Sequence, residues 1–410
     1  MEQFLTQAKQ SASILANLSD DIKSNILNQM ADKLIEQTAY IIAKNRLDMQ
    51  NADKMELSSA MKDRLLLDEK RIEDMASSLR LIASLRDPVG KILDGWTSPD
   101  GLKINKVSVP IGVIGIIYES RPNVTSDTAG LCFKSGNVCV LKGGKEAQNS
   151  NEIIAEILQS VLVENSLPAS CISLLPDSSR EGVANLIKAD RYVDLIIPRG
   201  GEGLIRYVND NSTVPVVKHD KGLCHTYIDK EANAQKAIEI SINAKCQRPG
   251  VCNAMETLLV HKDIAKHILP ILAERFEDEG TKLRGCFTTN TLIEVDEATD
   301  EDWNMEYLAN ILSIKIVQNI EEAVEHISKY GSGHSEAIIS ENYTAINYFL
   351  DNVDAACVYA NASTRFTDGA MFGFGAEVGI STNKLHARGP MGVEGLTTYK
   401  FKIYGSGQIR

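Results

Sequence analysis

Cys252 stands in the segment Gln247-Arg-Pro-Gly-Val-Cys-Asn253, shortly after a proline–glycine pair. Pro249-Gly250 ends the preceding helix and predicts a turn, which places Cys252 at a junction between a loop and a helix. Unpaired backbone N–H groups and the helix dipole at such a junction stabilise a thiolate. The same N–H groups can bind the oxyanion that forms when a thiolate attacks a carbonyl carbon. Cys252 is therefore a candidate nucleophile, and the alternative is a small cysteine of the core.

A glycine loop follows the expected strand Val193–Ile197 and precedes an apolar helix. This loop contains Arg199, Gly200 and Gly201, in the strand–loop–helix arrangement that binds phosphate at a helix N-terminus. It lacks the full G-x-G-x-x-G spacing, so an ordinary glycine-rich turn is an equally good interpretation.

A second glycine loop, Lys142-Gly143-Gly144-Lys145, follows the expected strand Val138–Leu141. Its glycines allow a close approach of the backbone to a ligand. Its two lysines could hold a ribose 2′-phosphate, as an NADP site requires. The alternative is a solvated turn.

Polar residues that could hold a substrate gather in two later segments. His334, in Gly331-Ser-Gly-His-Ser-Glu336, could position a polar substrate or could simply fill a loop. The run from Asn361 to Arg365 combines an amide, the hydroxyl of Ser363 and a guanidinium, and arginine binds a carboxylate or a phosphate through two parallel hydrogen bonds. A helix-capping turn is the competing interpretation of this run.

Arg121-Pro122 and Arg388-Gly-Pro concentrate positive charge in loop-like segments of a chain whose net charge is −12. This distribution suits a phosphorylated ligand, whereas the absence of a basic block excludes a nucleic-acid binder. His219, Cys224 and His225 are close in sequence but lack a second clustered pair, so we expect no metal site.

Eight cysteines are scattered without a C-x-x-C pair, which favours thiols in a reducing compartment. The longest apolar run, Val109 to Tyr118, is far shorter than the roughly 20 residues of a membrane-spanning helix. The N-terminus shows no basic region followed by an apolar stretch, so no secretory signal is expected. We expect a cytoplasmic protein without a membrane span.

The expected elements follow a simple order along the chain. The first ninety residues read as helices, with Ser19 as an N-cap and a helix over Asp68–Leu85. A hairpin is expected over residues 94–110. Strands and helices then alternate to about residue 230 and again to about Asn361, which predicts parallel sheets covered on both faces. Thr397–Tyr404 reads as a final strand.

Several of these segments, in this order, resemble those of aldehyde dehydrogenases. The matching segments are Val107–Gly115, Gly136–Lys142, Gln247–His261, Ile320–Gly331 and Phe372–Gly375. More specifically, the chain is similar to the branch of that family that reduces the acyl phosphate L-glutamyl 5-phosphate. The strings that carry this closer similarity are Tyr118–Thr125, Leu141–Ala147, Ile197–Gly201, Gln247–Asn253, Tyr330–Ile338, Asn361–Phe366 and Gly373–Lys384.

The resemblance implies roles for individual residues. Cys252 matches the nucleophile, Lys142 the lysine that contacts the adenosine ribose, and Glu306 the acidic residue that holds the nicotinamide ribose. Asn123 is our choice for the oxyanion-binding amide, although the surrounding run Ser120-Arg-Pro-Asn123 departs from the family pattern. With the loops described above, the cofactor set is Lys142, Gly143, Lys145, Arg199, Gly200, Gly201 and Glu306, and the substrate set is Arg121, His334, Ser363, Arg365 and Arg388.

One departure from the family bears on the reaction. Hydrolytic aldehyde dehydrogenases carry a general-base glutamate in a Glu-Leu-Gly-Gly-Lys run, and the corresponding stretch here is Val217-Lys-His-Asp-Lys-Gly222. A dehydrogenase that makes a free acid needs a base to activate water. A reductase that starts from an acyl phosphate does not, because phosphate is already a good leaving group.

The resemblance implies an α/β fold of the aldehyde dehydrogenase type. We expect a Rossmann-like NADPH-binding domain (1–232, with the oligomerisation hairpin 94–110), a catalytic α/β domain (233–361), and a return to the cofactor domain with an oligomerisation strand (362–410). The implied reaction is NADPH-dependent reduction of L-glutamyl 5-phosphate to L-glutamate 5-semialdehyde and phosphate through a Cys252 thioester, in proline biosynthesis.

The implied partners are the small-molecule acyl phosphate, further copies of the chain in a homo-oligomer, and a transient contact with glutamate 5-kinase. No kinase-like segment precedes the reductase, so a stand-alone form is expected. A CoA-acylating or hydrolytic aldehyde dehydrogenase is the alternative enzyme, and a non-catalytic scaffold on the same fold is the alternative class.

Overall fold

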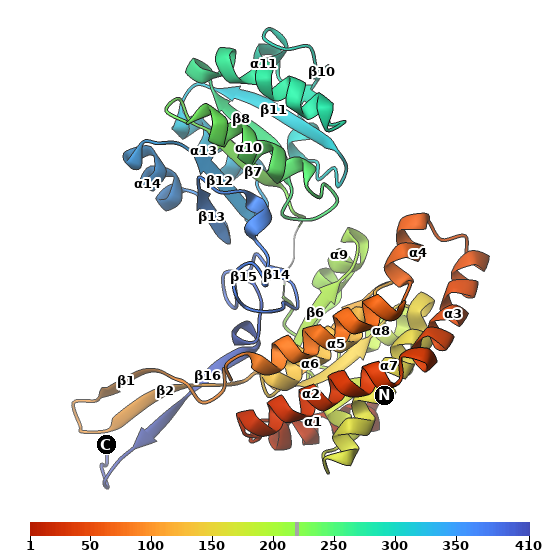
Figure 1. Cartoon of the computed structure of the whole chain (residues 1–410). Coiled ribbons are helices and arrows are strands. Elements are labelled where there is room, and N and C mark those ends of the chain that lie inside the picture. The colour runs from red at the N-terminus through yellow and green to blue at the C-terminus, as the bar shows by residue number, and fades with distance from the viewer. Residues whose placement is uncertain (218–220) are drawn as a thin grey trace. The chain divides into compact units, whose positions relative to one another are not determined.

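The structure is a computed structural model that describes residues 1–217 and 221–410. The chain forms two compact units (Figure 1). Unit 1 comprises Met1–Lys218, Gly373–Gly379 and Leu385–Arg410, and unit 2 comprises His219–Phe372 and Ile380–Lys384.

The N-terminal part of unit 1 is helical, as expected. Its helices are α1 Glu2–Leu15, α2 Asp20–Glu36, α3 Thr38–Lys54, α4 Ser59–Leu65 and α5 Glu69–Ser84. Ser19 is the N-cap residue of α2 without a side-chain capping bond, whereas Asp68 caps α5 by accepting a hydrogen bond from the backbone N–H of Arg71. Helix α5 buries Ile72, Met75 and Leu79 at helical spacing, and this face packs against α2 and α6.

A four-stranded parallel sheet forms the centre of unit 1, with strand order β5-β4-β3-β6. Its strands are β3 Val113–Tyr118, β4 Val138–Lys142, β5 Ile172–Leu174 and β6 Leu195–Arg199, and its further helices are α6 Asn123–Lys134, α7 Gln148–Glu164, α8 Arg180–Leu186 and α9 Glu202–Asn211, with the short 3₁₀ turns Lys145–Ala147 and Ala169–Cys171. The order reverses between β3 and β6, which makes the carboxyl ends of these two strands a topological switch point.

Strand β6 begins two residues later than the sequence indicated. The N–H of Val193 bonds the carbonyl of Ala189 at 2.9 Å and closes the turn that follows α8, so pairing with β3 begins at Leu195 opposite Ile114. At its other end, β6 continues to Arg199 opposite Tyr118.

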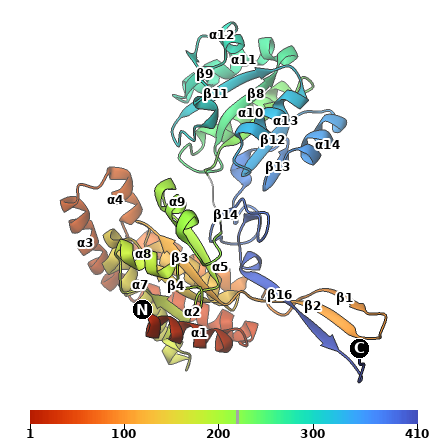
Figure 2. The ribbon, with the colours of Figure 1, turned by 180° about the vertical axis from the view of Figure 1, so that it is seen from behind.

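A second sheet of unit 1 has three antiparallel strands, β1 Ile92–Thr97, β2 Lys103–Pro110 and β16 Thr397–Tyr404. The expected hairpin is therefore present, and the C-terminal strand pairs with it from Pro110–Thr397 to Lys103–Tyr404. This sheet extends away from the helices of unit 1 (Figure 2). Every residue of β16 after Thr397 is exposed.

Unit 2 is built on a seven-stranded parallel sheet with order β10-β9-β11-β8-β7-β12-β13. Its strands are β7 Cys224–Ile228, β8 Met255–His261, β9 Lys282–Gly285, β10 Asp296–Glu297, β11 Ile311–Val317, β12 Ser335–Ile339 and β13 Cys357–Ala360, and its helices are α10 Ala234–Cys246, α11 Lys262–Asp278, α12 Phe287–Asn290, α13 Ile320–Tyr330 and α14 Tyr343–Asn352, with the 3₁₀ turns Asp302–Asn304 and Thr364–Phe366. The short segments β14 Ile380–Ser381, β15 Gly389–Pro390 and the 3₁₀ turn Glu394–Leu396 follow.

Strand β7 belongs to unit 2, although the domain boundary expected after residue 232 would assign it to the first domain. The physical reason is pairing: β7 hydrogen-bonds to β8 on one side and to β12 on the other. Strands β7, β8 and β12 are buried along their whole length, as parallel strands covered on both faces are.

Candidate active site

Cys252 lies in a tight turn between α10 and β8, which corrects the loop-to-helix junction expected from the sequence. The N–H of Ala254 closes the turn on the carbonyl of Val251 at 3.0 Å. The next residue, Met255, begins β8, because the apolar run from Met255 to His261 pairs with β7 and β11 rather than continuing as a helix. Cys252 is partly buried, and no dipole of a following helix acts on it.

The backbone of Gly222 packs directly against this turn. A Cβ atom on Gly222 would lie 1.9 Å from the carbonyl oxygen of Cys252 and 2.3 Å from its Cα. The N–H of Gly222 donates a hydrogen bond of 2.8 Å to Oε1 of Glu306. One glycine therefore links the candidate nucleophile to the residue expected to hold the nicotinamide ribose.

The segment that carries Glu306 is anchored by Asp302. The Asp302 carboxylate accepts hydrogen bonds from the Thr299 N–H at 2.7 Å and the Tyr307 hydroxyl at 2.8 Å, and it pairs with Arg284. Burial opposes ionisation of Asp302, but the donors from Thr299, Tyr307 and Arg284 outweigh it and lower its pKa to about 2. At neutral pH, Asp302 thus carries a negative charge that holds both ends of this segment.

A buried ion pair supports the other side of the same segment. Lys245 Nζ lies 2.6 Å from Oε2 of Glu256, and both side chains are fully buried. Oε1 of Glu256 accepts from the Leu308 N–H at 3.3 Å. Burial raises the pKa of Glu256 to about 7, against the opposing effect of Lys245.

Arg365 lies within electrostatic reach of Cys252. Its Nε donates to Oε1 of Gln247 at 2.8 Å. Burial first, and then the neighbouring charge of Arg248, lower the pKa of Arg365, while Asp368 and Cys252 act in the opposite direction. The structure therefore adds Arg248 to the expected cation Arg365. Arg248 was overlooked in the sequence although it stands four residues before Cys252 in the same string.

The other two substrate candidates of unit 2 are buried. His334 is fully buried, and its Nδ1 lies 2.9 Å from Ser335 Oγ and 3.7 Å from Cys224 Sγ. Ser363 is the N-cap residue of the turn Thr364–Phe366, and its hydroxyl accepts from the N–H of Arg365 at 3.3 Å. The structure therefore agrees with the interpretation of Ser363 as the capping residue of a turn.

In unit 1, the Gly200–Gly201 loop lies at the switch point between β3 and β6. Gly201 is the N-cap of α9, and its N–H donates to Oε2 of Glu119 at 3.1 Å. A carboxylate thus occupies the position at a helix N-terminus that favours an anion, which fits a phosphate cradle. Nη1 of Arg199 donates to the carbonyl of Val378 at 2.5 Å, so its guanidinium is held by the returning chain.

The second glycine loop borders a cavity of about 230 Å³. Gly143, Gly144 and Ser178 line it, and Nζ of Lys142 donates to the carbonyl of Ser178 at 2.8 Å. Burial lowers the pKa of Lys142, partly offset by the carboxylates nearby. Lys145 is exposed and forms no ion pair within residues 1–217 and 221–410, so its charge is available to an anion.

The remaining expected residues of unit 1 are exposed. Asn123 begins α6, and its Nδ2 donates to Asp127 at 2.9 Å, which uses one of its two amide N–H bonds. Arg121 and Arg388 are both exposed. Lys218, His219 and Asp220, the core of the stretch that replaces the hydrolytic glutamate, lie outside the described residues.

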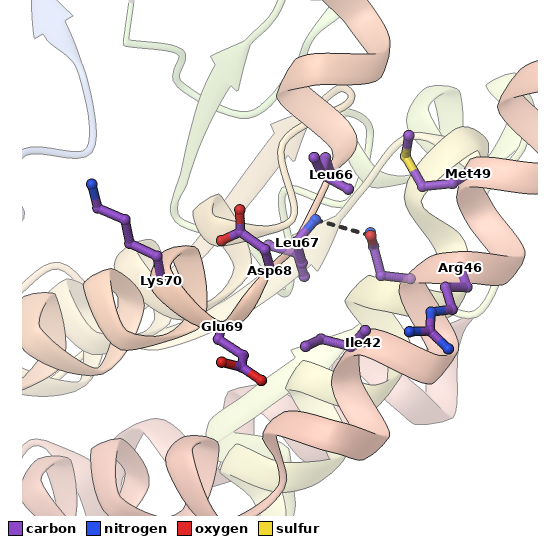
Figure 3. A pocket seen from close by; sticks show the side chains of 9 residues that line it. Ile42, Arg46, Met49, Leu66, Leu67, Asp68, Glu69 and Lys70 are labelled. Atoms are coloured by element: carbon purple, nitrogen blue, oxygen red, sulfur yellow. Dashed lines mark hydrogen bonds between the residues drawn. The ribbon is translucent and has the colours of Figure 1, made fainter.

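A separate cavity of about 550 Å³ lies in the helical part of unit 1, beside α3 and the start of α5 (Figure 3). Asn45, which lines this cavity, donates to the Leu65 carbonyl and the Ser150 hydroxyl and accepts from the Leu67 N–H. The side-chain amide of Asn45 thus has its hydrogen-bond partners within the protein.

Within the described ranges, no group of three or more His, Cys, Asp or Glu side chains is placed to hold a metal ion. All eight cysteines are described, and none forms a disulfide. No helix among the described residues is long and apolar enough to cross a membrane.

The fold and the turn-borne cysteine define an oxidoreductase of the aldehyde dehydrogenase type. The model of the aldehyde dehydrogenase family matches residues 2–281 and 277–400, and the chain belongs to this family. An acetylating aldehyde dehydrogenase from Geobacillus thermoglucosidasius, 17% identical, shares the fold with a TM-score of 0.68 over 100% of this chain and 97% of that chain. The fold expected from the sequence is confirmed.

Within the family, the chain is similar to proteins named Gamma-glutamyl phosphate reductase. The protein of that name from Sulfurovum sp. (strain NBC37-1) is 67% identical, and the one from Sulfurimonas denitrificans 66%, each over 100% of both chains. A crystal structure of Gamma-glutamyl phosphate reductase from Thermotoga maritima is 46% identical, with a TM-score of 0.98 over 100% of this chain and 99% of that chain. The closer resemblance seen in the sequence is confirmed.

Proposed function

We propose that the protein reduces L-glutamyl 5-phosphate to L-glutamate 5-semialdehyde and phosphate with NADPH, as a step of proline biosynthesis. The observation that carries the proposal is the Cys252 turn, with Gly222–Glu306 on one side and Arg365 within electrostatic reach. The names of the full-length relatives support the substrate.

In the proposed reaction, the Cys252 thiolate adds to the acyl carbon, and the carbonyl electron pair moves to oxygen. The Asn123 amide, through the N–H that Asp127 does not use, is our candidate to stabilise this oxyanion. When the oxyanion collapses, the carbon–oxygen bond to phosphate breaks, and phosphate departs with the electron pair. A thioester on Cys252 remains.

NADPH, when bound, supplies the hydride that reduces this thioester. The resulting tetrahedral adduct expels the Cys252 thiolate and releases the aldehyde, so the thiolate is regenerated and the electrons balance. Arg248 and Arg365 would hold an anionic group of the substrate beside Cys252, because guanidinium groups bind carboxylate and phosphate. Arg121 and Arg388 remain candidates for binding the anionic groups of the substrate, while His334 and Ser363 would support the Cys252 site from the interior of unit 2.

The residues of unit 1 fit a nicotinamide dinucleotide. Gly200 and Gly201 would hold the pyrophosphate at the N-terminus of α9, and Arg199 borders them. Gly143 lines the cavity of about 230 Å³, and Lys142 donates to Ser178 in the same lining; these two residues would hold the adenosine ribose. The exposed ammonium of Lys145 would bind the 2′-phosphate, and Glu306 in unit 2 the nicotinamide ribose.

The acyl acceptor in the reverse reaction tests the proposal. Purified protein is given glutamate 5-semialdehyde and NADP after exhaustive removal of phosphate, and NADPH absorbance is recorded with added phosphate, arsenate, CoA or none of these. NADPH should form only with phosphate, in a saturable manner, or with arsenate, whose acyl ester hydrolyses spontaneously. The Cys252→Ala variant should form none while it still binds NADP.

Sustained turnover without phosphate or arsenate would identify water as the acceptor and favour the hydrolytic alternative. Turnover that requires CoA would favour the CoA-acylating alternative. Full activity of Cys252→Ala would overturn the covalent mechanism.

The proposal also includes the cellular compartment, the assembly and a partner of the enzyme. Eight cysteines without a disulfide suit the reducing cytoplasm. The exposed strands β1 and β16 suit a homo-oligomer. The lability of an acyl phosphate would favour a transient contact with the glutamate 5-kinase that makes it.

A further inference from the structure

Side chains of unit 2 hold two main-chain carbonyls of the Cys252 turn. Sγ of Cys224, the first residue of β7, lies 3.2 Å from the carbonyl oxygen of Cys252 and donates to it. The hydroxyl of Thr364 donates to the carbonyl of Asn253 at 2.8 Å. These two carbonyls therefore face the interior of unit 2.

The sulfur of Cys224 is a thiol that can donate. Cys224 is fully buried, and burial, with Glu336 next in importance, raises the pKa of its thiol well above the ordinary value. A protonated S–H is a weak donor, whereas a thiolate would repel the carbonyl oxygen. His334 Nδ1 lies 3.7 Å from the same sulfur and 2.9 Å from the hydroxyl of Ser335, so the Cys224 side chain has polar neighbours inside unit 2.

The hydrogen bond to Cys252 has a geometric consequence on the other side of the peptide. The C=O of Cys252 and the N–H of Asn253 belong to one planar trans peptide and point in opposite directions. Since the C=O points to Cys224, the N–H of Asn253 points away from it. Within residues 1–217 and 221–410, no acceptor for this N–H is found.

We propose that Cys224 is a positioning residue for Cys252: its thiol anchors the Cys252 carbonyl and thereby aims the Asn253 N–H at the oxyanion formed on the substrate. The inference rests on the proposed covalent function of Cys252. The bond that forms is Cys252 Sγ to the substrate carbonyl carbon, and the electron pair displaced to oxygen is what the Asn253 N–H stabilises. Cys224 itself touches neither substrate nor cofactor.

The test compares three variants in the phosphate-dependent oxidation of glutamate 5-semialdehyde. Cys224→Ala removes the donor, Cys224→Ser replaces it with a hydroxyl, and Cys286→Ala is the matched control. Cys286 is a cysteine of unit 2 whose Sγ contacts Thr289, and no contact joins it to the Cys252 turn among the described residues. The measurements are kcat, KM, the melting temperature and the rate at which iodoacetamide alkylates Cys252.

We expect Cys224→Ala to lower kcat about tenfold, with KM changed less than about twofold. The loss should be smaller than the roughly 100-fold that follows removal of an oxyanion donor, because the Asn253 N–H is displaced and not removed. Cys224→Ser should recover most of the loss, and Cys286→Ala should match the unsubstituted protein. Alkylation should proceed at the unsubstituted rate in all three variants, because alkylation of a thiolate forms no oxyanion. A disordered turn would instead lower alkylation and kcat together.

A Cys224→Ala enzyme with an unchanged kcat would overturn the inference. So would a serine variant no better than alanine, an equal loss in Cys286→Ala, or an alkylation rate that falls in step with kcat. Failure of the proposed function would give a different result from failure of the inference on Cys224, because the unsubstituted protein would then show no phosphate-dependent turnover.

Discussion

Gly222 and Cys252 are in backbone contact: a Cβ atom on Gly222 would come within 1.9 Å of the Cys252 carbonyl oxygen and 2.3 Å of its Cα. Those atoms are main chain, so they cannot rotate away as a flexible side chain could. The N–H of the same glycine holds Glu306. The position of the candidate nucleophile therefore depends on the absence of a side chain at residue 222.

Gly222→Ala should consequently lower kcat by about 100-fold, since a displacement of about 1 Å at reacting groups has that effect. The melting temperature should also fall. Gly203→Ala is the control, because nothing lies within 4 Å of a Cβ there and alanine is favoured in the helix α9. Steady-state kinetics and calorimetry check both variants, and normal turnover in Gly222→Ala would contradict the contact.

Lys145→Glu should discriminate between the two nicotinamide cofactors. If the exposed ammonium binds the 2′-phosphate, its replacement should weaken NADPH binding by about 30-fold, equivalent to ~2 kcal/mol for a charged hydrogen bond. NADH binding should change little. Titration calorimetry measures both, with the exposed Lys70→Glu as a charge-matched control elsewhere in unit 1. Equal losses for NADPH and NADH would mean that Lys145 does not contact this phosphate.

Asp302 should make unit 2 sensitive to acid. Its pKa is lowered from 3.8 to about 2 in the folded protein, so the folded state binds fewer protons than the unfolded state between these values. The stabilisation is present above pH ~4 and is lost as the pH falls towards 2; after allowance for solvent screening it is on the order of 1 kcal/mol.

The Asp302→Asn variant should therefore melt below the unsubstituted protein at pH 7, and the gap should shrink at pH 3. It should also bind the cofactor more weakly, because Asp302 and Tyr307 hold the segment of Glu306. Melting curves at the two pH values check the first expectation. A gap that stays constant with pH would show that the charge of Asp302 is not what stabilises the segment.

The β1–β2–β16 sheet should form a contact between copies of the chain. Trp96 and Phe401 pack edge to face, with ring centroids 6.0 Å apart, yet each remains about half exposed, as does Ile403. An apolar surface of this kind marks an interface. Phe401→Lys combined with Ile403→Lys should therefore give a monomer in light scattering, whereas Lys402→Gln on the same strand should not.

Substitution tests this proposed interface more cleanly than a deletion of the residues after Gly395 would. Deletion would also remove Leu396, which is fully buried and whose carbonyl accepts from Asn137 at 2.8 Å. Loss of assembly after deletion could then reflect damage to unit 1. An unchanged mass for the double lysine variant would contradict the proposed interface.

Local sequence determined the elements and the chemistry of single residues. Apolar spacing placed α5 within a residue of its observed ends, and period-two alternation placed β16, because these patterns depend on neighbours a few residues apart. The order of motifs identified the family and Cys252 as its nucleophile candidate. The turn that follows Pro249-Gly250 was also correct, but its continuation as a helix was wrong, since β7 and β11 recruit Met255–His261 into the sheet.

The surroundings of Cys252 were decided only by the tertiary structure. Gly222 and Cys224, which touch its backbone, were not among the expected site residues. Glu306 accepts from Gly222, and Arg365 acts electrostatically on Cys252, from distant parts of the sequence of unit 2. His334 reads as a loop residue by its glycine neighbours, yet pairing of β12 with β7 buries it completely. Such contacts depend on which strands become neighbours in a sheet, and strand order is a property of the whole chain that short spacings do not encode.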